Sequence, residues 1–338
     1  MQLSRLFRSK VIFWVNLAFG IGLLGWFLAE YGSAAWRVLQ KDYDAPAFLG
    51  FLLALTAGIG TLAWRWRFLL RQLAVTPGFV RMMIYRSAAH SFGSIIPSGR
   101  MGGDPLRAWL LTRDGVQASH SIAGTVVDRT LELGATAPFT VCFAFLLLQH
   151  GLHEITNALL TLIAAAAALL IGAGFAARRL RNGTGLVSAL ARSTRAQEWS
   201  FVQNKMGLIE DSEAATAVLE RARGRLAVGF LAGLVANIFV ILEFALLLEA
   251  FGLPTEPVAV VAAIFATGAS QMLPIPASVG VLEGAQIWIF GMLGYPAEVG
   301  VAVALLVRMR EMIWLTPGLI FLSWGPVRAA LRRIHDEN

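Results

Sequence analysis

The segment PSGRMGGDP, at residues 97–105, interrupts an otherwise apolar stretch that runs from Met82 to Leu111. Its prolines and glycines cannot continue one α-helix, because proline removes a backbone donor and glycine disfavours helical order. Such a stretch is typical of two short helices joined by a turn. We therefore expect a hairpin over residues 82–111 whose two ends lie on the same side. The residues that break it are Pro97, Gly99, Gly102 and Gly103.

The rest of the sequence has the composition of a membrane protein. Of the 338 residues, 57% are apolar and only 14% are charged, whereas an average soluble domain has about 25% charged residues. Several apolar stretches reach the roughly 20 residues that a helix needs to cross about 30 Å of hydrocarbon. We predict an all-α integral membrane protein with six full spans. These spans are residues 11–29, 47–70, 121–148, 158–177, 226–250 and 299–324.

Basic residues are distributed unevenly between the connections. They gather before the first span, in a stretch between the second span and the hairpin, in residues 178–225 and at the C-terminus. The positive-inside rule places such segments in the cytosol, with both termini cytoplasmic in a cell (inner) membrane. The net charge of +7 then reflects topology or anionic lipid headgroups, and we expect no nucleic-acid partner. The stretch assigned to the cytosol contains Arg65, Arg67, Arg71, Arg81 and Arg86.

A second interrupted apolar stretch lies in the C-terminal half, and we expect it to form another re-entrant hairpin over residues 258–293. Its breaks are Pro274, Pro276 and Gly280. Adding 179 to positions of the first half aligns the residues least expected in lipid. The aligned pairs are Pro97 with Pro276, Asp104 with Glu283, Trp109 with Trp288, Arg129 with Arg308, Glu132 with Glu311 and Pro138 with Pro317.

This internal similarity predicts two repeats, residues 1–150 and 151–338. By the count of basic residues in the connections, the first hairpin enters from the cytosolic face and the second from the outer face. The repeats would therefore have inverted topology, an arrangement that many transporters use for alternating access.

Charged residues within the apolar segments are the candidate functional residues. A charge at the bilayer centre costs about 2.5 to 3.5 kcal/mol on insertion scales, so each of them needs a partner or water. The pairs Arg129–Glu132 and Arg308–Glu311 are spaced i, i+3 and each occupies one helix face. An alternative is that these pairs only hold helices together. The full set is Asp104, Arg107, Asp128, Arg129, Glu132, Glu283, Arg308, Arg310 and Glu311.

The first break offers a site of its own. Residues 98–105 supply free backbone donors, and Arg100 adds a guanidinium just before a new helix begins, which is typical of a phosphate or carboxylate site. Glycines packed between helices are the alternative interpretation. The single Cys142, the spacing of the histidines and the absence of a Walker A pattern lead us to expect no metal and no cofactor.

Several of these motifs together resemble a known family, the flippase-like transmembrane domain of lysylphosphatidylglycerol synthases. They are the stretch 97–107 followed by AWLL, Asp128-Arg129 with Glu132, the stretch 276–284, and the closing RMREMIWLTPG at 308–318. The resemblance covers about residues 10–325 and implies a protein that moves a lipid between leaflets. The bifunctional synthases continue into a soluble aminoacyltransferase domain, and this chain stops at Asn338, so we do not expect synthase activity.

The function expected from the sequence is lipid translocation by alternating access, without enzymatic activity. The resemblance leaves the cargo open between an anionic phospholipid, a glycolipid and an isoprenoid or hopanoid lipid. Arg100, Arg107 and Arg129 are expected to contact an anionic headgroup, while Asp104 and Glu283 hold the hairpin tips. Two alternatives are an intramembrane transferase acting on a lipid headgroup, and a non-transporting subunit of a lipid pathway. Partners beyond membrane lipids are left open between homo-oligomers and lipid-biosynthesis enzymes.

Overall fold

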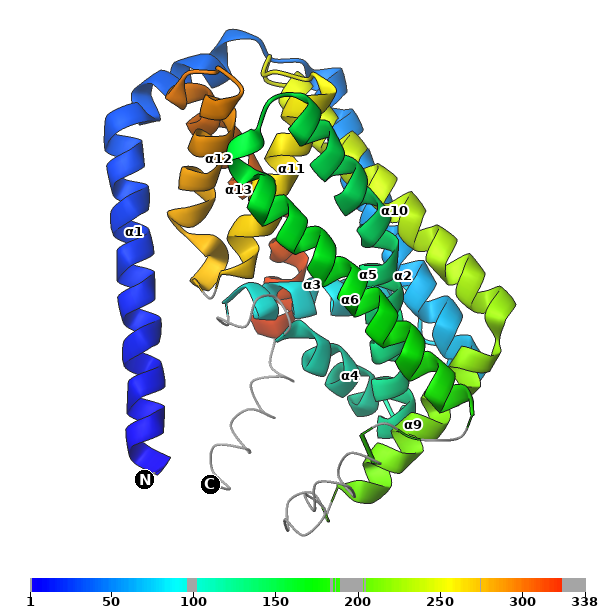
Figure 1. The fold of residues 1–338 in the computed structure, drawn as a ribbon. Helices are drawn as coiled ribbons and strands as arrows, with labels where there is room; N and C mark the ends of the chain where they lie inside the picture. The colour runs from blue at the N-terminus through cyan, green and yellow to red at the C-terminus, as the bar shows by residue number, and fades with distance from the viewer. Residues whose placement is uncertain are drawn as a thin grey trace.

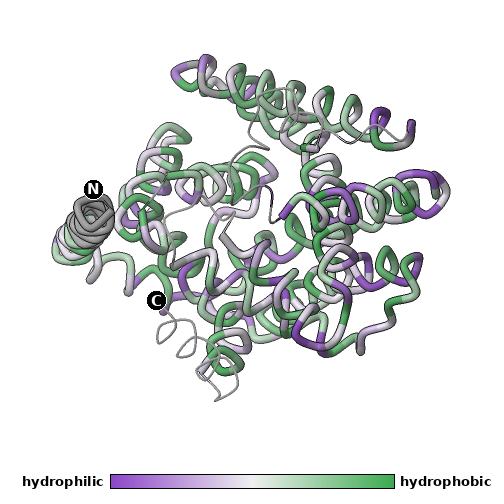
Figure 2. The backbone as a smooth tube through the Cα atoms, turned by 90° about the horizontal axis from the view of Figure 1, so that it is seen from below, coloured by the Kyte–Doolittle hydropathy of each residue, from purple (hydrophilic) through white to green (hydrophobic). Residues whose placement is uncertain are grey.

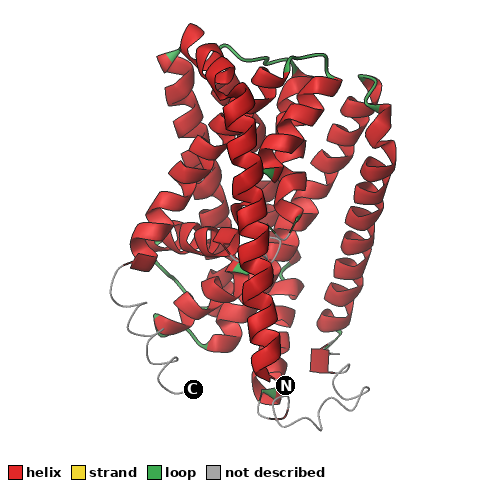
Figure 3. Cartoon of the chain, turned by 90° about the vertical axis from the view of Figure 1, so that its left-hand side faces the viewer, coloured by secondary structure: helices red, strands yellow, loops and turns green. Residues whose placement is uncertain are grey.

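The structure is a computed structural model that describes residues 2–95, 102–182, 185, 187–188, 203, 205–273 and 275–323. Its described residues form helices joined by short loops, with no strand among them (Figures 1 and 3). The long helices are α1 (Gln2–Lys41), α2 (Ala45–Leu70), α5 (Ala118–Gln149), α6 (Thr156–Arg181), α10 (Arg223–Glu249) and α13 (Ala297–Ser323). The shorter helices are α3 (Phe79–Ile95), α4 (Gly103–Arg113), α9 (Met206–Arg221), α11 (Pro257–Met272) and α12 (Val281–Met292). Single 3-10 turns are η1 (Arg71–Leu73), η2 (His153–Ile155) and η4 (Pro276–Ser278).

Within the described residues, four helical segments are long and apolar enough to cross a membrane by length and composition: Ala45–Leu73, Ala118–Gln149, Leu159–Leu180 and Arg223–Glu249. The sequence predicted six spans, and the other two lie in α1 and α13, which are not among these four. α13 is not apolar enough to be one of the four, because Arg308, Arg310 and Glu311 occupy the middle of its 27 residues. At about 1.5 Å per residue its length of roughly 40 Å would still suffice.

α1 differs from the prediction in its second half. Residues 30–46 were expected to be a loop, yet the helix runs unbroken to Lys41. No proline occurs in α1, and the next one, Pro46, lies in the first turn of α2, where a missing N–H costs nothing. Asp44 caps α2 by accepting from the backbone N–H of Ala47 at 3.4 Å. Figure 3 shows α1 standing along one side of the other helices.

The helices of the second half repeat those of the first. Adding 179 to α2, α3, α4 and α5 gives residues 224–249, 258–274, 282–292 and 297–328, which match α10, α11, α12 and α13 within two residues at every boundary except the last. The contacts between helices show the same equivalence. α3 packs against α13, and their equivalents α11 and α5 also pack together, while α2 packs against its own equivalent α10. The helix boundaries of the two halves therefore correspond, whereas the two repeats and their inverted orientation remain a prediction.

Each predicted hairpin consists of two helices too short to cross a membrane. At about 1.5 Å per residue, α4 with 11 residues and α12 with 12 are each under 20 Å long, compared with about 30 Å of hydrocarbon. Gly103 opens α4, with Gly102 just before it, and Pro276 lies in η4. Gly280 precedes α12 with a φ of 78°, a conformation that favours glycine. Pro97, Gly99, Arg100 and Pro274 lie outside the described residues.

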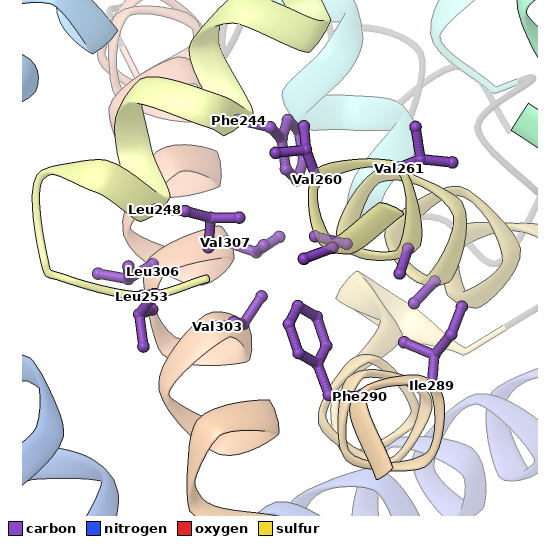
Figure 4. Packing of buried hydrophobic residues seen from close by; sticks show 14 of the residues in the cluster. Phe244, Leu248, Leu253, Val260, Val261, Ile289, Phe290, Val303, Leu306 and Val307 are labelled. Atoms are coloured by element: carbon purple, nitrogen blue, oxygen red, sulfur yellow. The ribbon is translucent and has the colours of Figure 1, made fainter. Parts of the chain in front are cut away.

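The largest buried apolar cluster is formed mainly by α10, α11, α12 and α13, with further residues from α1, α2, α5 and α6 (Figure 4). Phe244 and Leu248 from α10 meet Val260 from α11, Phe290 from α12 and Val307 from α13. Hydrophobic residues are frequent along the long helices, and hydrophilic residues form shorter stretches between them (Figure 2). Because lipid tails are as apolar as leucine, close packing more than the hydrophobic effect holds such helices together.

Gly318 tests this packing, because a Cβ at that position of α13 would lie 2.5 Å from the backbone carbonyl of Ser87 in α3. We expect Gly318→Ala to lower the stability of the purified protein by about 1–3 kcal/mol, the usual cost of overpacking. Gly291→Ala in α12 is the matched control, since nothing lies within 4 Å of its added Cβ. Thermal unfolding in detergent measures both variants. Equal midpoints for the two would contradict the proposed α3–α13 contact.

Candidate functional site

Asp128 is the centre of a buried charge network in the first repeat. Its carboxylate accepts hydrogen bonds from Arg65 Nε at 2.7 Å, Arg86 Nη1 at 2.9 Å and Arg107 Nη1 at 2.8 Å. The three arginines come from α2, α3 and α4, so one carboxylate on α5 joins all four helices of the repeat. The side chains of Asp128 and Arg65 are fully buried.

Glu132 lies one turn further along α5 and extends the network. Its carboxylate accepts from Arg65 at 3.3 Å, from Arg129 at 2.8 Å and from Arg86. Asp104 at the start of α4 accepts from Arg107 at 2.6 Å and lies 3.6 Å from Arg129 Nε. Among the described residues, the network thus contains four guanidinium groups and three carboxylates, which together leave one formal positive charge.

Arg65 and Arg86 are corrections to the sequence analysis, which assigned both to a cytosolic stretch. Arg65 is fully buried and Arg86 is 7% exposed, and both bind Asp128 and Glu132. By contrast Arg81 is 59% exposed and pairs with Asp114 at 3.0 Å. Counting arginines near span ends does not distinguish these cases, because it ignores which helix face each one occupies. The three carboxylates on α4 and α5, Asp104, Asp128 and Glu132, were the available signal, since buried acids need cations.

The second repeat binds its hairpin differently. Glu283 of α12 is fully buried and accepts from Arg308 Nε at 2.8 Å and Nη2 at 3.2 Å. Arg308 also donates to the carbonyls of Ala277 and Ser278, the latter at 2.8 Å. Both residues have a φ of 50°, a left-handed conformation that costs about 1 kcal/mol or more for a residue with a side chain. Arg308 therefore holds the strained turn η4 in place.

Two further pairs connect helices of this repeat. Arg310 Nε donates to Glu243 of α10 at 2.9 Å, and Glu243 was not among the predicted functional residues. Gln271 of α11 donates to Glu311. We expected Arg308 and Glu311 to form an i, i+3 pair that mirrors Arg129 and Glu132. The contacts described here instead join Arg308 to Glu283, because a long guanidinium reaches the neighbouring helix as easily as its own.

A cavity of about 300 Å³ lies between the two repeats. From the first repeat it is lined by Arg65, Arg86, His90, Asp104, Arg107, Arg129 and Glu132, and from the second by Asn237, Phe244, Thr267, Gln271, Arg310 and Trp314. The His90 ring stacks on Trp314, with centroids 4.6 Å apart. Thus Asp104, Arg107, Arg129, Glu132 and Arg310 share one cavity. Arg100 lies outside the described residues, while Asp128, Glu283, Arg308 and Glu311 lie outside this lining.

A metal centre finds no support here, since the described part of the chain has no group of three or more His, Cys, Asp or Glu that could hold a metal ion. The arrangement is rather that of a polytopic membrane protein, with apolar helices around a polar cavity lined by paired charges. The chain belongs to the family described as the lysylphosphatidylglycerol synthase TM region, whose model matches residues 13–318.

A curated relative agrees with this membership. A UPF0104 membrane protein of Methanothermobacter thermautotrophicus is 32% identical over 144 residues. The match covers 42% of this chain and 39% of that protein, so the chain matches well under half the length of its relative. The membrane location predicted from composition is supported by the family and by the apolar helices, and the resemblance noted in the sequence is confirmed.

Asp128→Asn tests whether this carboxylate holds four helices together. Removing one partner of a buried ion pair typically costs about 3–5 kcal/mol, because the remaining charges stay buried without compensation. We expect a large drop in the thermal unfolding midpoint. The control Arg81→Gln removes the exposed member of the Arg81–Asp114 pair, and an exposed pair of this kind contributes at most about 1 kcal/mol. The double variant Asp128→Asn with Arg86→Gln should recover part of the loss, and no recovery would argue against charge pairing as the cause.

Proposed function

We propose that this protein moves a lipid between the leaflets of the cell membrane by alternating access, and that it is not an enzyme. The observation that carries the proposal is the polar cavity between the two repeats, lined by five arginines in a chain that is otherwise largely apolar. Family membership supports a lipid-related membrane function. A lipid headgroup would pass through this cavity while its tails remain in the bilayer.

The number of charges exceeds what helix packing needs. Replacing a buried ion pair by well-packed apolar residues is often neutral or stabilising, so ion pairs are a poor choice for stability alone. Here Arg86, Arg107 and Arg129 line a cavity rather than a closed helix interface. Ionisable residues inside membrane segments that face a cavity typically mark the path of a substrate.

The arrangement of the repeats supports alternating access. In Figure 1 the α12–α13 connection lies at the upper end of the molecule and the equivalent α4–α5 connection lies towards the lower end. The upper connections, residues 42–44, 150–155, 250–256 and 293–296, contain no lysine or arginine, and one basic residue, Lys41 at the end of α1, adjoins the first of them. The lower connections adjoin Arg71, Arg113, Arg221 and Arg223. This charge asymmetry favours inverted repeats, with the lower end cytosolic.

The two equivalent ion pairs differ, as alternating access requires of inverted repeats. Glu283 and Arg308 are joined by two hydrogen bonds, the shorter of 2.8 Å. Their equivalents, Asp104 and Arg129, lie 3.6 Å apart, and Arg129 is bonded to Glu132 instead. One hairpin is thus firmly held by its span arginine and the other is held loosely. In the opposite state of the cycle the two pairs would exchange these roles.

Lipid sidedness in reconstituted vesicles tests translocation. We compare fluorescent anionic, zwitterionic and polyprenyl-phosphate lipids, and expect fast movement of one class that Arg129→Ala combined with Arg308→Ala slows at least tenfold. The reason is that both hairpins lose their span arginine. Arg81→Gln is the control, since Arg81 is exposed and remote from the cavity. Movement no faster than in empty vesicles for every lipid would contradict the proposal.

The orientation has its own test. In a Cys142→Ser background, Tyr43→Cys and Thr76→Cys place single thiols at exposed positions of the upper and lower connections. A membrane-impermeant maleimide added to intact cells should label only the first, because the charge asymmetry directs the upper end outward. Labelling of Thr76→Cys without permeabilisation would reverse the assignment.

A further inference from the structure

Glu243 and Arg310 form an ion pair that joins α10 to α13. Arg310 Nε donates to the Glu243 carboxylate at 2.9 Å, and both residues are buried. Apart from this pair the two helices make little contact, because α10 packs along α2 while α13 packs against α1, α3 and α12. The pair thus bridges two groups of helices, one around α2 and α10 and the other around α12 and α13.

The pair lies at one end of the cavity. Phe244, which follows Glu243 in the chain, lines the cavity together with Arg310. Towards the upper end of Figure 1, α10 and α13 then contribute buried residues to the largest apolar cluster (Figure 4): Leu247, Leu248, Val303, Leu306 and Val307. The cavity can open between α10 and α13 towards the upper end only if these side chains separate. The ion pair breaks when they do.

Glu243 depends on a single cation, unlike the carboxylates of the first repeat. Among the described residues, Arg310 is the only cation bound to Glu243. Asp128 and Glu132 each accept from three arginines instead. Loss of one arginine leaves those two carboxylates with cations, whereas loss of Arg310 leaves Glu243 with none.

Other ionisable groups around α10 are not placed to replace this cation. Arg65 of α2 faces α10 at Gly233, which is about 15 Å along the helix from Glu243. α11, which also packs against α10, contains no charged residue. His90 of α3 approaches only through the Trp314 ring, on which it stacks. The carboxylate therefore has no substitute partner when α13 moves away.

A carboxylate left alone among apolar side chains binds a proton. The reason is that an uncompensated buried charge is far less stable than the neutral acid. Protonation of Glu243 and separation of α10 from α13 are therefore linked, and each favours the other. Arg310 lines the cavity and keeps its charge there. The equivalent positions of the first half are Trp64 and Leu131, so that half has no counterpart of this pair.

We infer that Glu243 binds the proton that couples lipid movement to a proton gradient, exchanging Arg310 for a proton each time α10 and α13 separate. This inference rests on the proposed function and names its driving ion. On separation, the carboxylate takes a proton from water that enters from the upper side. On closure, Arg310 displaces this proton into the cavity, which then opens to the opposite side. The pair carries one net positive charge when open and none when closed, and one proton crosses per cycle.

A buried thiol tests the separation without any lipid movement. In a Cys142→Ser background, Val303→Cys places a thiol at a fully buried position of α13. At one fixed pH, Glu243→Gln, which resembles the protonated acid, should speed the reaction of this thiol with a water-soluble maleimide at least tenfold in detergent. Glu249→Gln is the matched control, because it changes an exposed glutamate of the same helix. Equal rates in Glu243→Gln and Glu249→Gln would overturn the inference.

Proton coupling itself is measured in vesicles that enclose a pH indicator. At zero membrane potential, a pH difference across the membrane should speed movement of the transported lipid at least threefold over equal pH, and lipid movement should change the internal pH. Glu243→Gln should abolish both responses, whereas Glu243→Asp, which keeps a titratable group, and Glu249→Gln should retain them. Both responses retained in folded Glu243→Gln would assign the proton to another group, such as His90, and would overturn the inference.

The two proposals fail in different ways. Lipid movement that neither responds to a pH difference nor changes the internal pH would leave translocation standing and remove proton coupling. Faster thiol reaction in Glu243→Gln without lipid movement in any vesicle would leave the linked separation of α10 and α13 standing and remove translocation.

Discussion

The constraint on which this structure depends is that every charge inside a membrane protein must find its partner within the protein. Asp128 meets this constraint by binding three guanidinium groups, one each from α2, α3 and α4. Each arginine is thereby drawn towards α5, and the short helix α4, which is too short to cross the bilayer by itself, is anchored through Arg107. The positions of four helices follow from one carboxylate.

The second repeat keeps the helix order but uses fewer charges. Val307 occupies the position equivalent to Asp128, and Gln286 the position equivalent to Arg107. Gln286 donates to the carbonyl of Ala263 and to Thr267 Oγ1, both at 3.0 Å, so an uncharged network replaces a charged one. Its hairpin depends instead on Arg308, which holds η4. Equivalent helices therefore have unequal electrostatics, with the positive surplus on one side of the cavity.

The different numbers of charged residues in the two halves make the two walls of the cavity electrostatically different. Arg65, Arg86, Arg107 and Arg129 line one wall, while Arg310 on the other wall is already neutralised by Glu243. The arginines without a neutralising partner on the second wall therefore lie on the side of the cavity formed by the first half.

The sequence by itself indicated the class of protein, most of the helices and the correspondence between the two halves. Apolar length, the breaks around Gly103 and Gly280, and the offset of 179 are local or linear properties of the chain, and the helix boundaries follow them. The sequence predicts helix ends well because each membrane helix must satisfy its backbone hydrogen bonds internally. Residues that interrupt these hydrogen bonds therefore mark where a helix ends.

Only the tertiary structure decided which charges are partners. Arg65 and Arg86 look like loop-flanking cations in the chain but lie at the centre of the network, and Arg308 binds Glu283 on another helix rather than Glu311 on its own. The physical reason is reach: an arginine side chain extends past its own helix surface, so its partner is set by the packing of helices distant in sequence. Local spacing carries no information about that packing.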